Sequence, residues 1–156
     1  MIIEIPILNG SPYTVLGSSP KLNLFNNTRF TLTYNVNNII IFTAMMPENY
    51  ISGQDINVKL FWFVRSIAGV QNVEWRVAFQ RLNEGVNLLS YSFNTEQALT
   101  VSVNTAYIQK TTSITIPLNA LGSIVPGDLF RMYVKLGVAD LGIPVDLSNI
   151  VLLNVP

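Results

Sequence analysis

The most constraining feature of this sequence is the alternation of apolar and polar residues over residues 73–82. Successive side chains of a β-strand point to opposite faces, so the alternation gathers large apolar groups on one face. These groups are Val73, Trp75, Val77 and Phe79. A slip of one residue in strand pairing would move all of them into water. The pattern therefore predicts a half-buried β-strand with a fixed register.

Seven other segments have strand-like runs of alternating or continuous apolar residues, many of them β-branched. They are residues 30–34, 39–42, 57–65, 99–103, 114–116, 129–136 and 150–155. No segment sustains the i, i+3, i+4 spacing of an amphipathic helix, and we expect only short helical turns, within residues 92–99 and 119–124. About eight strands without long helices predict an all-β fold, an antiparallel β-sandwich of the jelly-roll type.

The first 30 residues are less regular, because proline and glycine residues divide them into short apolar pieces. We expect residues 1–30 to form either an N-terminal arm laid along a neighbouring surface or the first irregular strands of the domain. Residues 31–156 are expected to form a single jelly-roll β-sandwich domain, in keeping with the length of the chain.

The side chains that most often perform catalysis are missing from this sequence. It contains no histidine and no cysteine, and 12% of its residues are charged while 49% are hydrophobic. Without histidine no side chain has an ordinary pKa near neutrality, and without cysteine there is no thiolate nucleophile, disulfide or Cys/His zinc site. No phosphate-cradling glycine loop or nucleophile elbow is present either. We therefore expect a protein that packs and binds, with no enzyme activity and no cofactor.

Charge and hydropathy argue against two classes of partner. Nine Lys and Arg residues balance nine Asp and Glu residues, and the basic residues are scattered, so we expect no nucleic-acid binding. No apolar run reaches the roughly 18 residues of a membrane helix, and the first residues lack a secretory signal, so we expect no membrane contact and synthesis in a cytoplasm. A net charge of zero makes self-association easier.

The acidic residues offer two candidate arrangements for chemistry. Asp128, Asp140 and Asp146 lack the order of a calcium loop, and the sequence favours solvated acids there, with Asp128 capping a turn. A glycosidase needs two carboxylates about 5–10 Å apart, and the sequence marks no such pair among its glutamates. The glutamates considered are Glu48, Glu74, Glu84 and Glu96. We expect neither a metal site nor a catalytic pair.

Apolar residues that the core does not need are candidates for an interface. Trp62 and Trp75 lie on the apolar faces of their strands, so core packing is favoured over a stacking platform for sugars. Phe61 and Phe63 share a face with charged neighbours, which indicates either an exposed interface patch or a second buried face. The predicted interface combines these two rings with the apolar residues of the N-terminal segment. It consists of Ile2, Ile3, Ile5, Ile7, Leu8, Phe61 and Phe63.

Several segments together resemble a known domain. They are residues 46–50 (MPENY), 60–62 (LFW), 73–79 (VEWRVAF), 81–82 (RL) and 126–132 (PGDLFRM). In combination they resemble a jelly-roll domain of the virion structural proteins of tailed bacteriophages, over about residues 42–155. Members of that family carry an Asp-rich stretch near the C-terminus. Residues 138–146 of this chain are thinner in acids and richer in apolar groups, so no ion site is carried over.

The resemblance implies a non-enzymatic component of the virion, made in the host cytoplasm and assembled as a homotrimer. The function we expect first is that of a capsid decoration (cement) or head-attached protein that binds the major capsid protein or a neighbouring virion protein. The alternative is a carbohydrate-binding, receptor-recognition domain of a tail fibre, with a host-surface glycan as partner. An enzyme acting on glycans is the third hypothesis.

Overall fold

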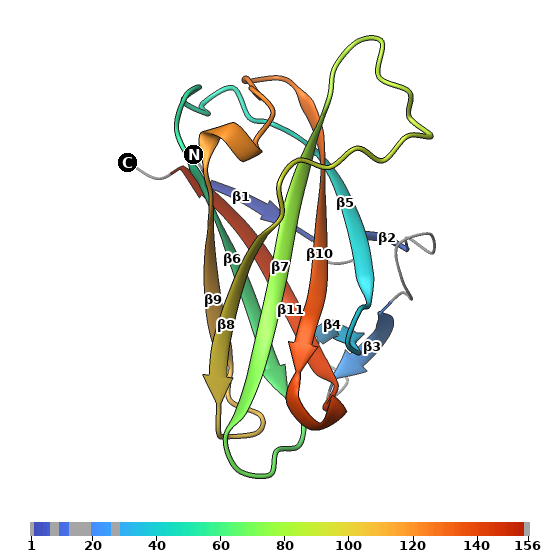
Figure 1. Cartoon of the computed structure of the whole chain (residues 1–156), viewed down its shortest axis with the longest axis vertical. Helices are drawn as coiled ribbons and strands as arrows, with labels where there is room; N and C mark the ends of the chain where they lie inside the picture. Colours follow the sequence, from blue (N-terminus) through green and yellow to red (C-terminus); the bar gives the residue numbers. More distant parts are fainter. Residues whose placement is uncertain (1, 7–9, 13–19, 26–28, 155–156) are drawn as a thin grey trace.

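A computed structural model of the chain describes residues 2–6, 10–12, 20–25 and 29–154. Within these residues the protein consists of two antiparallel β-sheets packed face to face, as Figure 1 shows. The predicted all-β sandwich is thereby confirmed. The helical turns are limited to single 3-10 turns, and no helix in the described residues has the length and hydropathy needed to cross a membrane.

The first sheet has six strands and is centred on the last strand of the chain, β11 (Val145–Asn154). One edge of β11 pairs with β6 (Ile56–Val64), and β6 pairs in turn with β9 (Lys110–Ile116). The other edge of β11 pairs with two short strands, one after the other along its length. They are β4 (Arg29–Tyr34), which carries β3 (Lys21–Phe25) at the edge of the sheet, and β1 (Ile2–Ile5).

The second sheet has five strands, in the order β2-β5-β10-β7-β8. Its long central pair is β7 and β10, which run antiparallel with a β-bulge between Leu136 and Val138. The strands are β2 (Gly10–Pro12), β5 (Ile39–Met45), β10 (Leu129–Ala139), β7 (Gln71–Leu82) and β8 (Gln97–Val103).

The order of β4 to β11 is that of a jelly roll. Four of these strands form the set β4-β11-β6-β9 and four form the set β5-β10-β7-β8, and the chain changes sheet at every connection except that between β7 and β8. Two 3-10 turns lie before and after β10. They are η2 (Leu118–Ala120), which overlaps the start of residues 119–124, where a short helical turn was predicted, and η3 (Asp140–Gly142).

The core lies between the sheets and is built from the faces that the alternation predicts. Trp62 and Trp75 are fully buried, 6.2 Å apart between ring centroids, and Tyr34 meets Trp75 edge-on at 5.1 Å. The indole Nε1 of Trp62 donates a hydrogen bond of 2.8 Å to Thr112 Oγ1, which satisfies its one polar atom. The preference for core packing of both tryptophans is confirmed.

The described parts of the first 30 residues are strands of the sandwich. β1 and β3 extend the six-stranded sheet, and β2 extends the five-stranded sheet along the outer edge of β5. The sequence left open whether residues 1–30 form an arm or the first irregular strands of the domain, and the described pieces are short strands. The division of the chain at residue 30 stays a prediction.

Candidate functional site

A long loop, residues 83–96 between β7 and β8, crosses the outer face of the five-stranded sheet; it is the yellow-green segment at the top of Figure 1. Its anchor is Phe93, which packs on a second apolar cluster formed by Ile39, Ile41, Ala78 and Tyr133. The Phe93 and Tyr133 rings meet edge-on with centroids 4.8 Å apart. This apolar contact fixes the loop against strands far from it in sequence.

Hydrogen bonds from β7 and β10 fix the tip of the loop. Gln80 Nε2 donates to the carbonyl oxygen of Ser90 over 3.2 Å, and Arg131 Nη2 donates to that of Leu88 over 2.8 Å. The guanidinium of Arg131 also lies 4.7 Å from the centroid of the Tyr91 ring, a cation–π contact. The loop is therefore held by side chains from two neighbouring strands.

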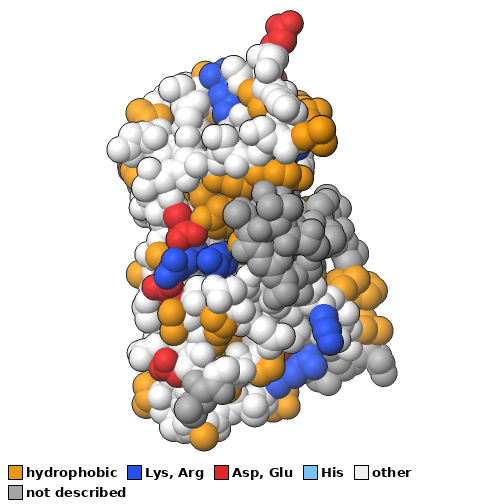
Figure 2. Space-filling model, turned by 45° about the vertical axis from the view of Figure 1, so that its right-hand side comes forward, with side chains coloured by type: hydrophobic (Ala, Val, Ile, Leu, Met, Phe, Trp, Pro, Cys, Tyr) orange, Lys and Arg blue, Asp and Glu red, His pale blue; other side chains and the backbone are white. Residues whose placement is uncertain are grey.

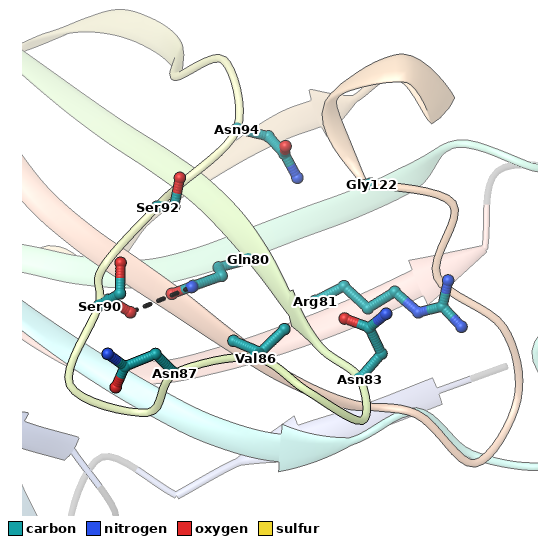
Figure 3. Close-up of a pocket in the computed structure, with 9 residues that line it drawn as sticks. All are labelled: Gln80, Arg81, Asn83, Val86, Asn87, Ser90, Ser92, Asn94 and Gly122. Atoms are coloured by element: carbon teal, nitrogen blue, oxygen red, sulfur yellow. Dashed lines mark hydrogen bonds between the residues drawn. The ribbon is translucent and has the colours of Figure 1, made fainter.

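Between the loop, the end of β7 and the turn after η2 lies a pocket of about 370 Å³, which we call the loop pocket. Its lining residues carry mostly amide and hydroxyl groups, and Figure 3 shows them arranged around the space. They are Gln80, Arg81, Asn83, Val86, Asn87, Ser90, Ser92, Asn94 and Gly122. The volume is within the range of about 300–1,000 Å³ typical of small-ligand sites. Amides and hydroxyls both donate and accept hydrogen bonds, so the pocket suits a ligand that does the same.

Gln80 is the most deeply buried polar residue of the loop pocket, with 4% of its surface exposed. Its Nε2 is bonded to Ser90, but its Oε1 is buried and has no hydrogen-bond partner among the described residues. A buried acceptor without a partner costs about 1–3 kcal/mol. This oxygen lies beneath the surface of the pocket, so a ligand could reach it only if the Gln80 side chain moved.

The one charged side chain that lines the loop pocket, Arg81, is neutralised by Asp128. Arg81 Nε lies 2.7 Å from Asp128 Oδ2, and Arg81 Nη2 donates to Asp128 Oδ1 over 3.2 Å. Asp128 Oδ2 also accepts the backbone N–H of Val125 over 2.7 Å, which confirms the predicted turn-capping role. The ion pair leaves the pocket without net charge.

Gly122 keeps one wall of the loop pocket open. Its φ of +69° lies in the left-handed region that favours glycine, and a Cβ at this position would lie 2.8 Å from Asn94 Nδ2. Any other residue would therefore press on the Asn94 amide, which faces Gly122 in Figure 3.

Two of the four candidate glutamates meet beside this site, on the outer face of the five-stranded sheet. Arg76 Nε donates to Glu74 Oε1 over 2.5 Å, and Arg76 Nη1 donates to Glu96 Oε1 over 3.1 Å. The hydroxyl of Tyr133 donates a short hydrogen bond to Glu96. Burial raises the pKa of Tyr133, and the hydrogen bond to Glu96 raises it further. The hydrogen bond to Glu74, together with the charges of Glu74 and Glu96, raises the pKa of Arg76. The other two candidates, Glu48 and Glu84, are exposed.

The three candidate metal-binding acids lie apart and have other partners. Asp146 is fully buried and accepts hydrogen bonds from Arg65, Thr31 and Thr33, whereas Asp140 accepts the backbone N–H of Asn72. Within the residues that the structure describes, no group of three His, Cys, Asp or Glu side chains is placed to hold a metal ion.

The predicted interface residues are divided between two faces of the six-stranded sheet. Ile3 and Ile5 face the core, whereas the register places Ile2 and Phe61 on the outer face. Phe61 is half-buried, but Phe63 is 4% exposed, so the buried alternative holds for Phe63 and the expectation of two surface rings is wrong. Ile7 and Leu8 lie outside the described residues. The interface itself stays a prediction.

Sequence reasoning did not find the loop pocket. Gln80 falls on the polar face of the strand predicted over residues 73–82, which does not distinguish it from an ordinary surface residue, and residues 83–96 have no periodic pattern. The available indication was composition, because this segment holds Asn83, Asn87 and Asn94 beside two serines. That composition is also typical of an ordinary loop.

No protein-family model and no curated protein matches the sequence. Solved structures with the same fold do match. The tandem CBM22 domains of Paenibacillus barcinonensis Xyn10C align with a TM-score of 0.57 and 13% identity over 98% of this chain and 49% of that chain. This chain thus spans about half the length of that structure.

Two further structures are similar. One contains the CBM22-1 and GH10 modules of Clostridium thermocellum xylanase Xyn10B complexed with xylohexaose, with a TM-score of 0.51 and 9% identity over 99% of this chain and 28% of that chain. The other is TmCBM61 in complex with β-1,4-galactotriose, with a TM-score of 0.47 and 12% identity over 94% of this chain and 87% of that chain. At these identities the likeness establishes the β-sandwich fold alone.

Proposed function

We propose that this chain is a non-catalytic carbohydrate-binding domain that holds its glycan in the loop pocket. The observation that carries the proposal is the lining of the pocket, where the amides of one glutamine and three asparagines and the hydroxyls of two serines surround the space. A sugar presents many hydroxyls, each both a donor and an acceptor, and such groups match this lining. The alternative predicted from the sequence is thus the better supported one.

The fold is compatible with this function. The two structures that align with TM-scores of 0.57 and 0.51 contain carbohydrate-binding modules, and one of them was solved with xylohexaose. Because fold likeness does not determine function, it supports the proposal only together with the pocket.

The engagement of the nearby acids supports the absence of catalysis. Glu74 and Glu96 both pair with Arg76, and Asp128 pairs with Arg81. These contacts engage the carboxylates with guanidiniums, so they are not positioned as a pair of free acids on either side of a glycosidic bond. If incubation with a bound glycan released new reducing ends, the non-catalytic part of the proposal would be wrong.

The place of the domain in the organism remains a prediction from the sequence resemblance. That resemblance suggests a tail fibre of a bacteriophage, where a glycan-binding domain would recognise the host surface. Capsid decoration, the function expected first, rests on the resemblance alone.

Substitution of Gly122 by Ala tests the site. The new Cβ would displace the Asn94 amide, so we expect glycan affinity, measured by calorimetry with the best ligand from a glycan array, to fall by about tenfold or more. Gly142→Ala is the matched control, because its φ of +66° brings the same backbone strain while nothing lies within 4 Å of the new Cβ. Equal affinities of the two variants would contradict binding in the loop pocket. Binding of no glycan by the wild-type protein would contradict the function.

A further inference from the structure

The basic residues next to the loop pocket are occupied by other groups. Arg81 forms its ion pair with Asp128, at side-chain exposures of 28% and 16%. Arg131, the cross-strand neighbour of Gln80, donates to the carbonyls of Leu88 and Ser90 and lies against Tyr91. An acidic sugar that entered the pocket would therefore find the N–H groups of both guanidiniums engaged by other partners, although only the charge of Arg81 is cancelled by an acid.

Next to the loop pocket, basic side chains lie beside acidic ones. On the face shown in Figure 2, basic and acidic side chains adjoin one another at mid-height, and two basic side chains lie together at the lower right. Farther along the outer face of the five-stranded sheet, Arg76 is shared between Glu74 and Glu96. Charged ligands are steered to sites by patches of one sign, and paired charges cancel this effect beyond a short distance.

Apart from Arg81, the polar side chains of the pocket lining are amides and hydroxyls, which carry no charge. A carboxylate or sulfate group that entered the pocket would lose part of its hydration. The guanidinium that lines the pocket is already paired with Asp128, so it would not replace that hydration.

We infer that the loop pocket selects uncharged sugars and rejects uronic acids and sulfated sugars, because Asp128 neutralises the one charged side chain of its lining. This selectivity rests on the proposed function, because it specifies the class of glycan that the same pocket binds. It makes Asp128 the residue that determines charge specificity, although Asp128 does not line the pocket.

The test is a glycan array that carries neutral and acidic oligosaccharides, followed by calorimetry with xylohexaose and an oligogalacturonate of equal length at low and high ionic strength. We expect the wild-type protein to prefer the neutral sugars by about tenfold or more, with an affinity that salt does not change. Asp128→Asn keeps an oxygen for the Val125 N–H but frees the charge of Arg81. In this variant the preference for neutral over acidic sugars should shrink by about tenfold at low salt and return at high salt.

Asp140→Asn is the matched control, since it makes the same change of charge at an acid whose contact is with Asn72, away from the pocket. Its preference should equal that of the wild type. Acidic sugars bound by the wild type as tightly as neutral ones would overturn the selectivity and leave the carbohydrate-binding function standing. An unchanged preference in Asp128→Asn would likewise overturn it. Failure of the wild type to bind any sugar would overturn the proposed function itself.

Discussion

At the scale of single residues, the fold buries one charged side chain completely among those described, that of Asp146. Its carboxylate accepts hydrogen bonds from Arg65 Nε and Nη2, both at 2.8 Å, and from the hydroxyls of Thr31 and Thr33 at 2.9 and 2.6 Å. These four donors replace the water that the carboxylate loses on burial. The acid therefore ties β11 to β4 and to the end of β6.

Asp146→Asn should destabilise the protein by about 2 kcal/mol, because it removes the charge that all four donors point to. Arg65 is 40% exposed and can be solvated in the variant, which keeps the loss below that of a fully buried pair. Urea denaturation measures the free energy of unfolding. Asp140→Asn, at a partly exposed acid, should cost less than about 1 kcal/mol, and equal losses would show that the Asp146 cluster does not stabilise the fold.

Tyr133 makes the stability depend on pH in the alkaline range. Burial and Glu96 raise its pKa above the ordinary 10.0, so the folded protein keeps the phenolic proton at a pH where the unfolded chain has lost it. Its contribution is complete below pH 10, and it is lost as the pH rises further. We expect urea denaturation to show a loss of stability above that pH, with a smaller slope in Tyr133→Phe. Identical slopes would contradict this role of Tyr133.

At the scale of elements, the bulge in β10 makes room for the Arg76–Glu74 ion pair. Gly137 lies at the shift of register, and a Cβ there would overlap both Arg76 Nε and Glu74 Oε1. A side chain at the bulge would therefore be incompatible with the ion pair in its present position on the outer face of the five-stranded sheet.

Gly137→Ala should lower the free energy of unfolding by about 1 kcal/mol, because the ion pair must move aside. The loss should shrink when Glu74→Ala has already removed one of the overlapping atoms, and a double-mutant cycle by urea denaturation measures this coupling. Additive effects of the two substitutions would mean that Gly137 is not required by the ion pair.

The eight strands β4 to β11 could be predicted because each has a local run of alternating or continuous apolar residues, and where the run alternates the buried face could be predicted too. In β6 the alternation correctly assigns Val58, Leu60 and Trp62 to the core. The strands β1 to β3 are short, and their pairing depends on partners far away in sequence, such as β11. Local patterns do not encode such partners.

The loop pocket could not be predicted for the same physical reason. It exists because Phe93 docks on Tyr133 and because Gln80 and Arg131 hold the loop tip, and these contacts join segments from 10 to 43 residues apart.

At Phe63 the local pattern left two alternatives open, an exposed patch and a buried face. Its charged neighbours on the strand indicate an exposed face, but the fold places it opposite the buried Asp146.

At the scale of the whole molecule, two of the residues predicted for a homotrimer interface, Ile2 and Phe61, lie on the outer face of the six-stranded sheet. Ile2 is 71% exposed there, and Phe61 shares this face. Phe61→Glu should therefore convert a trimer into monomers in light scattering. Val70→Glu is the control, because it adds the same charge at an exposed apolar residue in the β6–β7 connection. An unchanged mass of the Phe61→Glu variant would contradict the predicted interface.

The central claim, that a glycan occupies the loop pocket, is tested most directly by nuclear magnetic resonance of the side-chain amides during titration with the best neutral oligosaccharide. Gln80, Asn87 and Asn94 are three of the four amide residues that line the pocket, whereas Asn57 and Asn149 report on the outer face of the other sheet. We expect the three pocket amides to shift in a saturable manner while the other two stay in place. Shifts of Asn57 and Asn149 without shifts in the pocket would contradict the claim.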